Sequence, residues 1–306
     1  MTEYIYKSYE ENKGFEEFQA EIYNSVANKF GAQTVTGEAI KKRMQDHKPD
    51  QDRNGITFVF DNNMKPVAYI QYREYAQGKV RIGYPWAKEG TPQEVKDKLF
   101  YDLFDYLKIK YPETKKFYLG FINHAFSNVI EEVTNYYGFK EDTTFAAYAL
   151  DIEKASSLNI PSDYSFKEAT ASDIDLLIEI DASNGNKSKL SKEKLKEFFE
   201  KHFTLDNKEQ LTIILSYHDN EVGIIALSKI KQKDKDYFSV RLLSLKNDNE
   251  TLYQYIFSAT GKIMNKKGLN YPITLNFIKS QEEKEELFKK LGGEFVSKAY
   301  EFCYEL

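Results

Sequence analysis

Residues 56–70 read ITFVFDNNMKPVAYI, and this stretch decides the fold because the chain contains its pattern twice. A β-branched and aromatic run, a turn at Asp61–Asn63 and a second apolar run predict a β-hairpin. Residues 211–225, LTIILSYHDNEVGII, have the same order of apolar run, Asp-Asn turn and apolar run. Val67 and Val222 occupy equivalent places 155 residues apart, so the hairpin indicates an internal repeat.

A second pair of segments recurs at nearly the same spacing. Residues 118–122, YLGFI, match residues 274–278, TLNFI, at an offset of 156 residues. A polar helical stretch follows each of them and ends at a glycine, Gly138 in one copy and Gly292 in the other. The sequence therefore predicts a tandem duplication, in which a final strand closes each half at 143–152 and 297–306.

Each half is predicted to follow the order β-α-α-β-β-β-α-β-α-β. An antiparallel hairpin run followed by crossover helices indicates an α+β fold with a mixed α/β sheet. We therefore expect two domains, 1–153 and 164–306, each with a central mixed, largely antiparallel sheet flanked by helices. The joint at 153–163 is polar and shows no clear periodicity.

Composition and charge exclude several classes of protein. The 306 residues carry a net charge of −5 and no strongly basic block, which argues against a duplex nucleic-acid partner. A single cysteine, Cys303, excludes an internal disulfide framework and a cysteine-based zinc site. No apolar run approaches the ~18 residues of a membrane span, and the first residues do not resemble a signal peptide. We expect a cytoplasmic protein that binds neither membrane nor metal.

This order of elements, at this length, resembles the GCN5-related N-acetyltransferase (GNAT) fold, present twice. The resemblance covers nearly the whole chain and is carried by the pattern of elements more than by invariant motifs. Tandem members of this kind include the mycothiol synthase type, in which one half carries the activity. The resemblance implies an acyl-CoA-dependent N-acyltransferase, with acetyl-CoA as the default acyl donor and catalysis in the first half.

The family's fourth strand normally runs into a loop of the form Q/R-x-x-G-x-G/A. Backbone N–H groups of this loop and of the helix after it bind the pyrophosphate of coenzyme A, because a helix start attracts anions. Residues 80–94 match in the strand, in the following proline, in a basic residue and in one glycine, but lack the glycine pair. By resemblance, the cofactor-binding residues are Ile82, Gly83, Tyr84, Lys88, Glu89, Gly90 and Thr91, with Asn123 and Asn128 where family members place a cofactor-contacting asparagine.

A competing interpretation of the same loop stays open. Thr91-Pro92-Gln93-Glu94 has the pattern of a capping box with proline at the first helical position. In that case Glu94 and not a phosphate satisfies the first N–H groups. The corresponding segment of the second half, 246–251, is short, acidic and without glycine, so we interpret the second half as structural.

The acyl transfer needs only a positioned amine and a group that accepts one proton from it. In many family members a tyrosine four residues before the Gly-Phe pair protonates the departing thiolate, but Thr134 and Phe288 stand at these positions here. The nearby Tyr136 and Tyr137 are candidate replacements. The candidate bases are His124, just past the fifth strand, and Glu74, late on the third strand.

Two other functions compete with this prediction. Loss of both tyrosine positions and of the glycine pair is compatible with a non-catalytic GNAT pair that binds a ligand or partner. Transferases of the Fem type, which use aminoacyl-tRNA, also carry paired GNAT-like halves, but the acidic balance counts against tRNA binding. For the enzyme we expect a small-molecule or peptide amine as acceptor and a monomer or homodimer as assembly.

Overall fold

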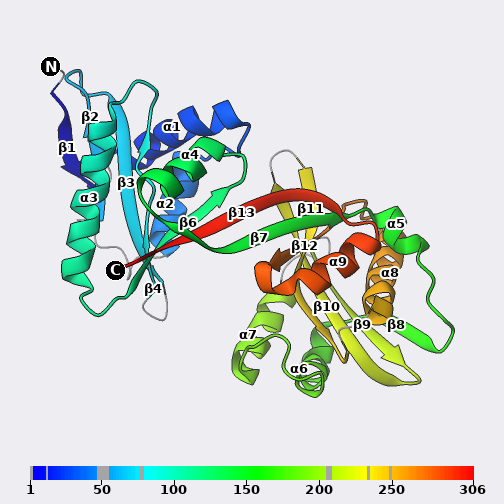
Figure 1. Ribbon diagram of the computed structural model, residues 1–306. Helices are drawn as coiled ribbons and strands as arrows, with labels where there is room; N and C mark the ends of the chain where they lie inside the picture. Colours follow the sequence, from blue (N-terminus) through cyan, green and yellow to red (C-terminus); the bar gives the residue numbers. More distant parts are fainter. Residues whose placement is uncertain are drawn as a thin grey trace. The chain divides into compact units, whose positions relative to one another are not determined.

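The computed structural model describes residues 3–11, 13–46, 55–75, 79–204, 209–232, 235–247 and 250–306. The chain forms two units (Figure 1). The first unit combines Met1–Thr144 with Lys298–Leu306, and the second comprises Phe145–Ser297. These units differ from the predicted halves, 1–153 and 164–306, because the division falls inside a strand and the last nine residues join the first unit.

The first unit follows the predicted order of elements, as the bounds show. They are β1 (Ile5–Ser8), α1 (Phe15–Ala27), α2 (Gly37–Asp46), β2 (Ile56–Phe60), β3 (Pro66–Tyr75), β4 (Lys79–Ile82), β5 (Trp86–Ala87), α3 (Gln93–Lys110), β6 (Lys116–Asn123) and α4 (Ser127–Glu131). A 3₁₀ turn at Asn28–Phe30 follows α1, and a π-helical turn, η4 (Glu132–Tyr136), follows α4.

The sheet of the first unit contains β1, β2, β3, β4, β6 and β13 (Glu294–Glu305), in that order. The pairs β1–β2, β2–β3, β3–β4 and β6–β13 are antiparallel, and β4–β6 is parallel. Alternate residues of β3 face opposite sides of the sheet. Ile70 packs in a core with α3, whereas Tyr69 packs in a second core with α1 and α2 (Figure 1).

The second unit repeats the plan after β7 (Lys140–Leu150). Its elements are α5 (Ile152–Ser157), β8 (Tyr164–Glu168), α6 (Ile174–Ser183), α7 (Lys192–Phe203), β9 (Gln210–Tyr217), β10 (Asn220–Gln232), β11 (Lys235–Leu245), α8 (Glu250–Lys266), β12 (Ile273–Ile278) and α9 (Glu282–Lys290), with 3₁₀ turns at Ala171–Asp173 and Lys279–Gln281. Its sheet has the order β8, β9, β10, β11, β12, β7, and β11–β12 is the parallel pair. The predicted mixed, largely antiparallel sheets are therefore present in both units.

The closing strands of the two halves do not pair as the sequence predicts. Each was expected to complete its own half, yet Phe145–Leu150 of β7 pairs with β12 in the second unit. Conversely, Ala299–Glu305 of β13 pairs with β6 in the first unit. The prediction was wrong because alternating apolar residues define a strand and its buried face but not the sheet that receives it.

The joint between the halves also differs from expectation, because it begins with a short helix, α5. The Asp151 side chain caps this helix by accepting hydrogen bonds from the N–H groups of Glu153 (2.8 Å) and Lys154 (3.3 Å). Ile152 and Ala155 are buried in the core of the second unit. Six residues with two apolar anchors are too few for a periodicity to be visible in the sequence.

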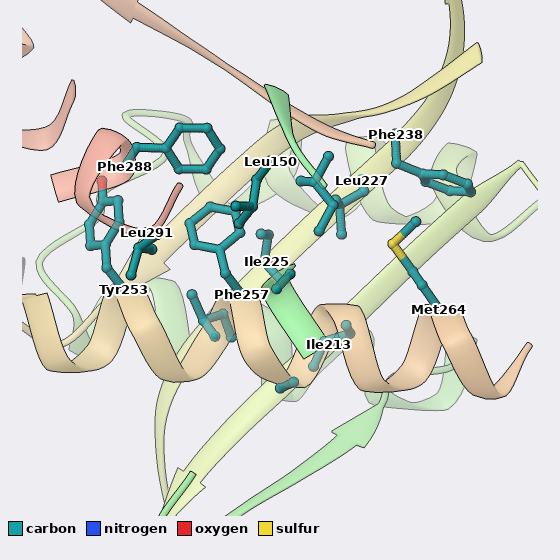
Figure 2. Close-up of a cluster of buried hydrophobic side chains, with 14 of the residues drawn as sticks. Leu150, Ile213, Ile225, Leu227, Phe238, Tyr253, Phe257, Met264, Phe288 and Leu291 are labelled. Carbon is teal, nitrogen blue, oxygen red and sulfur yellow. The ribbon is translucent and has the colours of Figure 1, made fainter. Parts of the chain in front are cut away.

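Helix α8 and the strands of the second unit enclose an apolar core (Figure 2). Phe257 and Met264 of α8 point toward the side chains of β9, β10 and β11, and Leu150 of β7 lies among them. Phe288, which stands at the family's tyrosine position, is fully buried against Phe257 and Phe277. Its ring therefore serves packing in this unit.

Candidate functional site

A cavity of about 270 Å³ lies in the first unit, between the sheet and helices α1 and α2. Its strand-borne walls come from β3, β4, β5 and β6, so the fourth and fifth strands of the predicted order border it. The polar and charged groups that line it are Gln19, Arg43, Gln71, Arg73 and Arg81, and the aromatic ones are Tyr23, Tyr69, Tyr72, Tyr84, Trp86 and Phe121. Among the described residues, no aspartate or glutamate lines the cavity.

The cavity lies at the point where β4 and β6 stop pairing. The two strands pair in parallel at Arg81 and Ile82, whereas Trp86 of β5 pairs only with β3, through Tyr69. Gly83 marks the point of divergence, where its N–H donates to the Gln71 carbonyl at 2.7 Å. A Cβ at Gly83 would lie 2.4 Å from the same carbonyl oxygen, so this close approach requires glycine. The cavity therefore lies where the fourth and fifth strands of the predicted order diverge.

Positive charge gathers on the sheet face of the cavity. Arg73 on β3 and Arg81 on β4 are direct cross-strand partners. Arg81 donates to Oε1 of Glu301 from Nε (3.0 Å) and Nη2 (2.5 Å), and Lys79 donates to Oε2 at 2.8 Å. The Arg81 guanidinium also lies 4.5 Å from the ring centre of Phe121. Glu301 is only 2% exposed, so the last strand supplies a buried counter-charge beside the cavity.

The loop before α3 does not form the capping box that its sequence pattern suggests. Pro92 occupies the N-cap position of α3, and no side-chain hydrogen bond caps this helix among the described residues. The predicted capping box is therefore absent, and the Thr91 hydroxyl donates instead to the Val67 carbonyl at 3.4 Å. Proline at the N-cap shifts the helix start to Gln93, which moves Glu94 out of the position that a capping box requires. The Val95 N–H donates to the Pro92 carbonyl at 3.1 Å, and no described side chain caps the N–H groups of Gln93 and Glu94, so this helix start has the features of an anion site.

The charged side chains of this loop pair with the elements around α1. Lys88 Nζ lies 2.5 Å from Oε1 of Glu21 on α1. Glu89 Oε2 lies 2.5 Å from Lys29 Nζ, whose hydrogen bond lowers the pKa of the Glu89 carboxyl. A phosphate that binds at this loop would compete with Glu21 for the ammonium of Lys88.

A hydrogen-bonded cluster connects the end of the cavity with α3. The Tyr84 hydroxyl donates to Glu132 Oε2 at 2.6 Å and accepts from Lys96 Nζ at 2.9 Å. Lys96 forms an ion pair with Glu132, and Gln93 Nε2 donates to Glu132 Oε1 at 3.0 Å. Burial, and after it the Glu132 carboxylate, raise the pKa of the Tyr84 phenol. Tyr84 is therefore a neutral, oriented wall of the cavity at physiological pH.

The structure distributes the predicted cofactor-binding residues over three places. Ile82, Gly83 and Tyr84 line the cavity. Lys88, Glu89, Gly90 and Thr91 form the loop before α3, where Gly90 adopts a positive φ of 82°. The Asn123 side chain accepts from the Ala125 N–H at 2.9 Å and so shapes the turn after β6, while Asn128 is exposed in the first turn of α4.

None of the four predicted catalytic side chains lines the cavity. The exposed His124 accepts from the Lys298 N–H through Nδ1 at 3.1 Å. Glu74 accepts from the Tyr111 hydroxyl at 2.6 Å, farther along β3. Both side chains thus support neighbouring segments of the first unit, and their catalytic roles stay predictions.

Tyr136 and Tyr137 both donate their phenolic protons to Asp97 of α3, at 2.7 Å and 3.2 Å. The hydrogen bond to Asp97 raises the pKa of Tyr136 to about 12. Burial, followed by the charges of Glu132 and Asp97, raises the pKa of Tyr137. Their protons are held more tightly than in free tyrosine. Thr134, at the family's tyrosine position, donates to the Ile130 carbonyl at 3.0 Å.

Sequence reasoning missed the residues that give the cavity its polarity. Tyr69, Gln71 and Arg73 alternate along β3, so a period of two would have placed them on one face. An antiparallel pairing of β3 with β4 in the observed register would then have brought Arg81 next to Arg73. Nothing in the local sequence indicates that Glu301 joins them, because it stands more than 200 residues later in the chain.

In the second unit, the counterpart of the cofactor loop is residues 246–251. In the counterpart of the cofactor loop, Asp248 and Asn249 lie outside the described residues. Across the described parts of both units, no group of three or more histidine, cysteine, aspartate or glutamate side chains is placed to hold a metal ion. No helix in those parts is both long enough and apolar enough to cross a bilayer.

Comparison with known proteins rests on structure. No protein-family model matches the sequence, and no curated protein matches it significantly. A GCN5-related N-acetyltransferase from Sphaerobacter thermophilus superposes with a TM-score of 0.66 at 10% identity, covering 99% of this chain and 95% of that one. A tandem GNAT protein from the clavulanic acid biosynthesis pathway gives a TM-score of 0.61 at 8% identity, covering 99% and 98%.

A GCN5-related glucosamine N-acetyltransferase region of a fungal multi-domain β-N-acetylglucosaminidase also matches. Its TM-score is 0.62 at 9% identity, with coverage of 99% of this chain and 38% of that one. Likeness at such low identity shows the fold. The chain therefore has the tandem GNAT fold that its repeated order of elements predicts.

Proposed function

We propose that the chain is an acyl-CoA-dependent N-acyltransferase whose active site lies in the first unit, with acetyl-CoA as the donor. The observation that carries the proposal is the cavity at the divergence of β4 and β6, followed directly by the uncapped start of α3. The loop at Lys88–Thr91 and the first N–H groups of α3 would hold the pyrophosphate. The acyl group would then reach the cavity past Gly83 and Tyr84.

The reaction forms a C–N bond between the amine and the acyl carbon, and it breaks the C–S bond of the thioester. The amine loses one proton, and the coenzyme A thiolate takes one up. Holding the two reactants in the right geometry contributes up to about 7–11 kcal/mol, which is the contribution a cavity at this place would make. A general base adds about 10²–10⁴-fold, and the described lining residues include no carboxylate or imidazole for that role.

This arrangement makes a prediction about pH. Since the described lining residues include no carboxylate or imidazole, we expect the acceptor amine to lose its proton to water before it attacks. The transfer rate should therefore rise with pH until the amine's own pKa is reached, without a plateau near pH 6–7 of the kind a histidine base produces. A plateau that disappears in His124→Gln would restore the role that the sequence predicts for His124.

A second candidate function is a binding protein that uses the GNAT fold without catalysis. It is favoured by the absence of all four predicted catalytic side chains from the cavity lining. It is also favoured by the aromatic packing of Trp86 against Tyr23, Tyr84 and Phe126 at the divergence of the strands. Such a protein would bind a ligand in the cavity without releasing free coenzyme A from acetyl-CoA.

Calorimetric titration with acetyl-CoA tests the proposal. We expect micromolar binding by the wild-type chain and at least tenfold weaker binding by Lys88→Glu, because a charge-assisted contact to phosphate is replaced by repulsion. Lys88→Gln should lie between them. Lys246→Glu is the matched control, since Lys246 is an exposed lysine at the corresponding loop of the second unit.

Each outcome of the titration has a consequence. Absence of binding would refute the acyl-CoA proposal. Binding weakened by Lys246→Glu and not by Lys88→Glu would place the cofactor outside the first unit. Binding without transfer to any amine would favour the second candidate function.

A further inference from the structure

Arg73 and Arg81 form an unusual pair at the sheet face of the cavity. They stand directly opposite each other on the antiparallel strands β3 and β4, so their side chains project from the same face. Like charges in this position repel each other, which destabilises a sheet unless an anion compensates. Both residues line the cavity, so the compensating anion has access to them.

Only one of the two arginines receives its counter-charge from the described residues. Arg81 has the carboxylate of Glu301, which is also shared with Lys79. Arg73 has no carboxylate partner in the described part of the chain. Its Nε is buried and forms no hydrogen bond. A buried guanidinium N–H left without an acceptor is costly, which indicates a site that a ligand completes.

The remaining lining selects for the charge and size of that ligand. Gln71 lies two residues before Arg73 on the same face of β3, and Gln19 of α1 donates to its Oε1 at 3.2 Å. A third arginine, Arg43 of α2, borders the cavity, and the described lining residues include no carboxylate, so Glu301 beside the cavity is the counter-charge of Arg81 alone among the three. The volume of about 270 Å³ is below the ~300–1,000 Å³ typical of drug-sized ligands, which indicates a small molecule.

We propose that this cavity binds a small molecule through an oxyanion, a carboxylate or a phosphate, held by the guanidinium of Arg73. The planar fork of arginine donates two parallel hydrogen bonds to either group. If the chain is the proposed acyltransferase, on which this part of the inference rests, the acyl acceptor is an amine that also carries a carboxylate or phosphate. The oxyanion fixes the acceptor on the sheet face while its amine meets the acyl group at the strand divergence.

Trp86 allows the binding step to be measured without catalysis. It lines the cavity and is the only tryptophan of the chain, so its fluorescence reports on occupancy of this site. The full-length chain is titrated with sodium acetate and with sodium phosphate at constant ionic strength, with sodium chloride as the reference. We expect a saturable change with at least one oxyanion and none with chloride.

Variants assign the signal to the guanidinium. Arg73→Gln should weaken oxyanion binding at least tenfold, and Arg73→Lys should weaken it less because the charge remains without the fork. Arg241→Gln is the matched control, since Arg241 is an exposed arginine of β11 and its loss changes the net charge equally. Unaltered oxyanion binding in Arg73→Gln, or no saturable signal in the wild type, would overturn the proposal.

A transfer assay then tests the acceptor class, with release of coenzyme A thiol as the readout. Matched pairs of acceptors are phosphoethanolamine with ethanolamine, and β-alanine with β-alaninamide, so the two pairs distinguish phosphate from carboxylate. We expect the anionic member of one pair to have the lower KM, and Arg73→Gln to raise that KM at least tenfold while the KM for acetyl-CoA is unchanged.

The two proposals fail in different ways. Equal transfer to charged and neutral acceptors would refute the acceptor class and leave the acyltransferase proposal intact. Oxyanion binding at Trp86 without any binding of acetyl-CoA would refute the acyltransferase proposal and leave the Arg73 site intact.

Discussion

The substitution Glu301→Gln tests how the last strand supports the candidate site. Glu301 is 2% exposed and accepts three hydrogen bonds, two from Arg81 and one from Lys79. Glutamine has nearly the same shape but carries no charge and keeps only one acceptor oxygen. The variant therefore leaves Arg81, whose side chain is 15% exposed, without its carboxylate and next to the cation of Arg73.

The expected cost follows from these contacts. Removing one partner of a buried ion pair costs about 3–5 kcal/mol, because the other charge stays buried and uncompensated. Lys79 is 31% exposed and can turn to water, and the amide oxygen of glutamine still accepts one bond, which reduces the cost. We expect the free energy of unfolding to fall by about 2–4 kcal/mol. This estimate concerns the first unit, to which Glu301 belongs.

Urea unfolding followed by Trp86 fluorescence measures this cost, because the single tryptophan lies in the first unit. Glu305→Gln is the matched control on the same strand. Its carboxylate is 63% exposed and lies 3.3 Å from Lys116, so its loss should cost less than about 1 kcal/mol. If Glu301→Gln were no more destabilising than Glu305→Gln, a stabilising role of the buried ion pair between Glu301 and Arg81 would be refuted.

Three further variants test other parts of the account. Gly83→Ala should destabilise the first unit by about 1–3 kcal/mol, because its Cβ would lie 2.4 Å from a backbone oxygen of β3. Urea unfolding followed by Trp86 fluorescence measures this loss. Gly120→Ala is the control, since a Cβ at Gly120 would meet open space. Burial lowers the pKa of His202 from about 6.5 to about 4, so protonation of the unfolded state should remove about 2 kcal/mol of stability between pH 7 and pH 5, a loss absent in His202→Gln. Unfolding followed by circular dichroism at both pH values tests this. Glu21→Gln should tighten acetyl-CoA binding about two- to fivefold in calorimetry, because it frees Lys88 from its carboxylate partner.

Each of these has an outcome that contradicts its reasoning. Equal stability of the two alanine variants would show that the close approach at Gly83 is not a constraint. Parallel pH profiles of the wild type and His202→Gln would show that the buried imidazole does not titrate as expected. Weaker or unchanged acetyl-CoA binding in Glu21→Gln would mean that Lys88 does not contact the phosphate.

The fold was predictable because its signals are local. Apolar runs with period two, Asp-Asn turns and the recurrence of both at 155–156 residues define the elements and their order. The exchange of closing strands was not predictable, since β7 and β13 have the same kind of alternating pattern. Which sheet receives a strand depends on contacts between residues more than 120 positions apart, such as Phe145 with Ile278.

The site was predictable only where it follows the chain continuously. Ile82, Gly83 and Tyr84 line the cavity because they lie at the end of β4 and directly after it. Their role in cofactor binding stays a prediction. The capping box was wrong because Pro92 takes the N-cap itself, a difference of one residue that the sequence pattern does not resolve. Arg73 and Glu301 were missed because their roles arise from the cross-strand register and from a distant strand.

Amide hydrogen exchange of the full-length chain, with and without acetyl-CoA, tests whether the first unit holds an acyl-CoA site. We predict slower exchange at residues 83–96, from the strand divergence through the first turn of α3, because bound acetyl-CoA would cover this segment and its pyrophosphate would accept from the N–H groups at the start of α3. We predict no change at the counterpart segment of the second unit, residues 246–253, which runs from the end of β11 through the first turn of α8. Protection confined to the second unit, or no protection in either segment, would contradict an acyl-CoA site in the first unit.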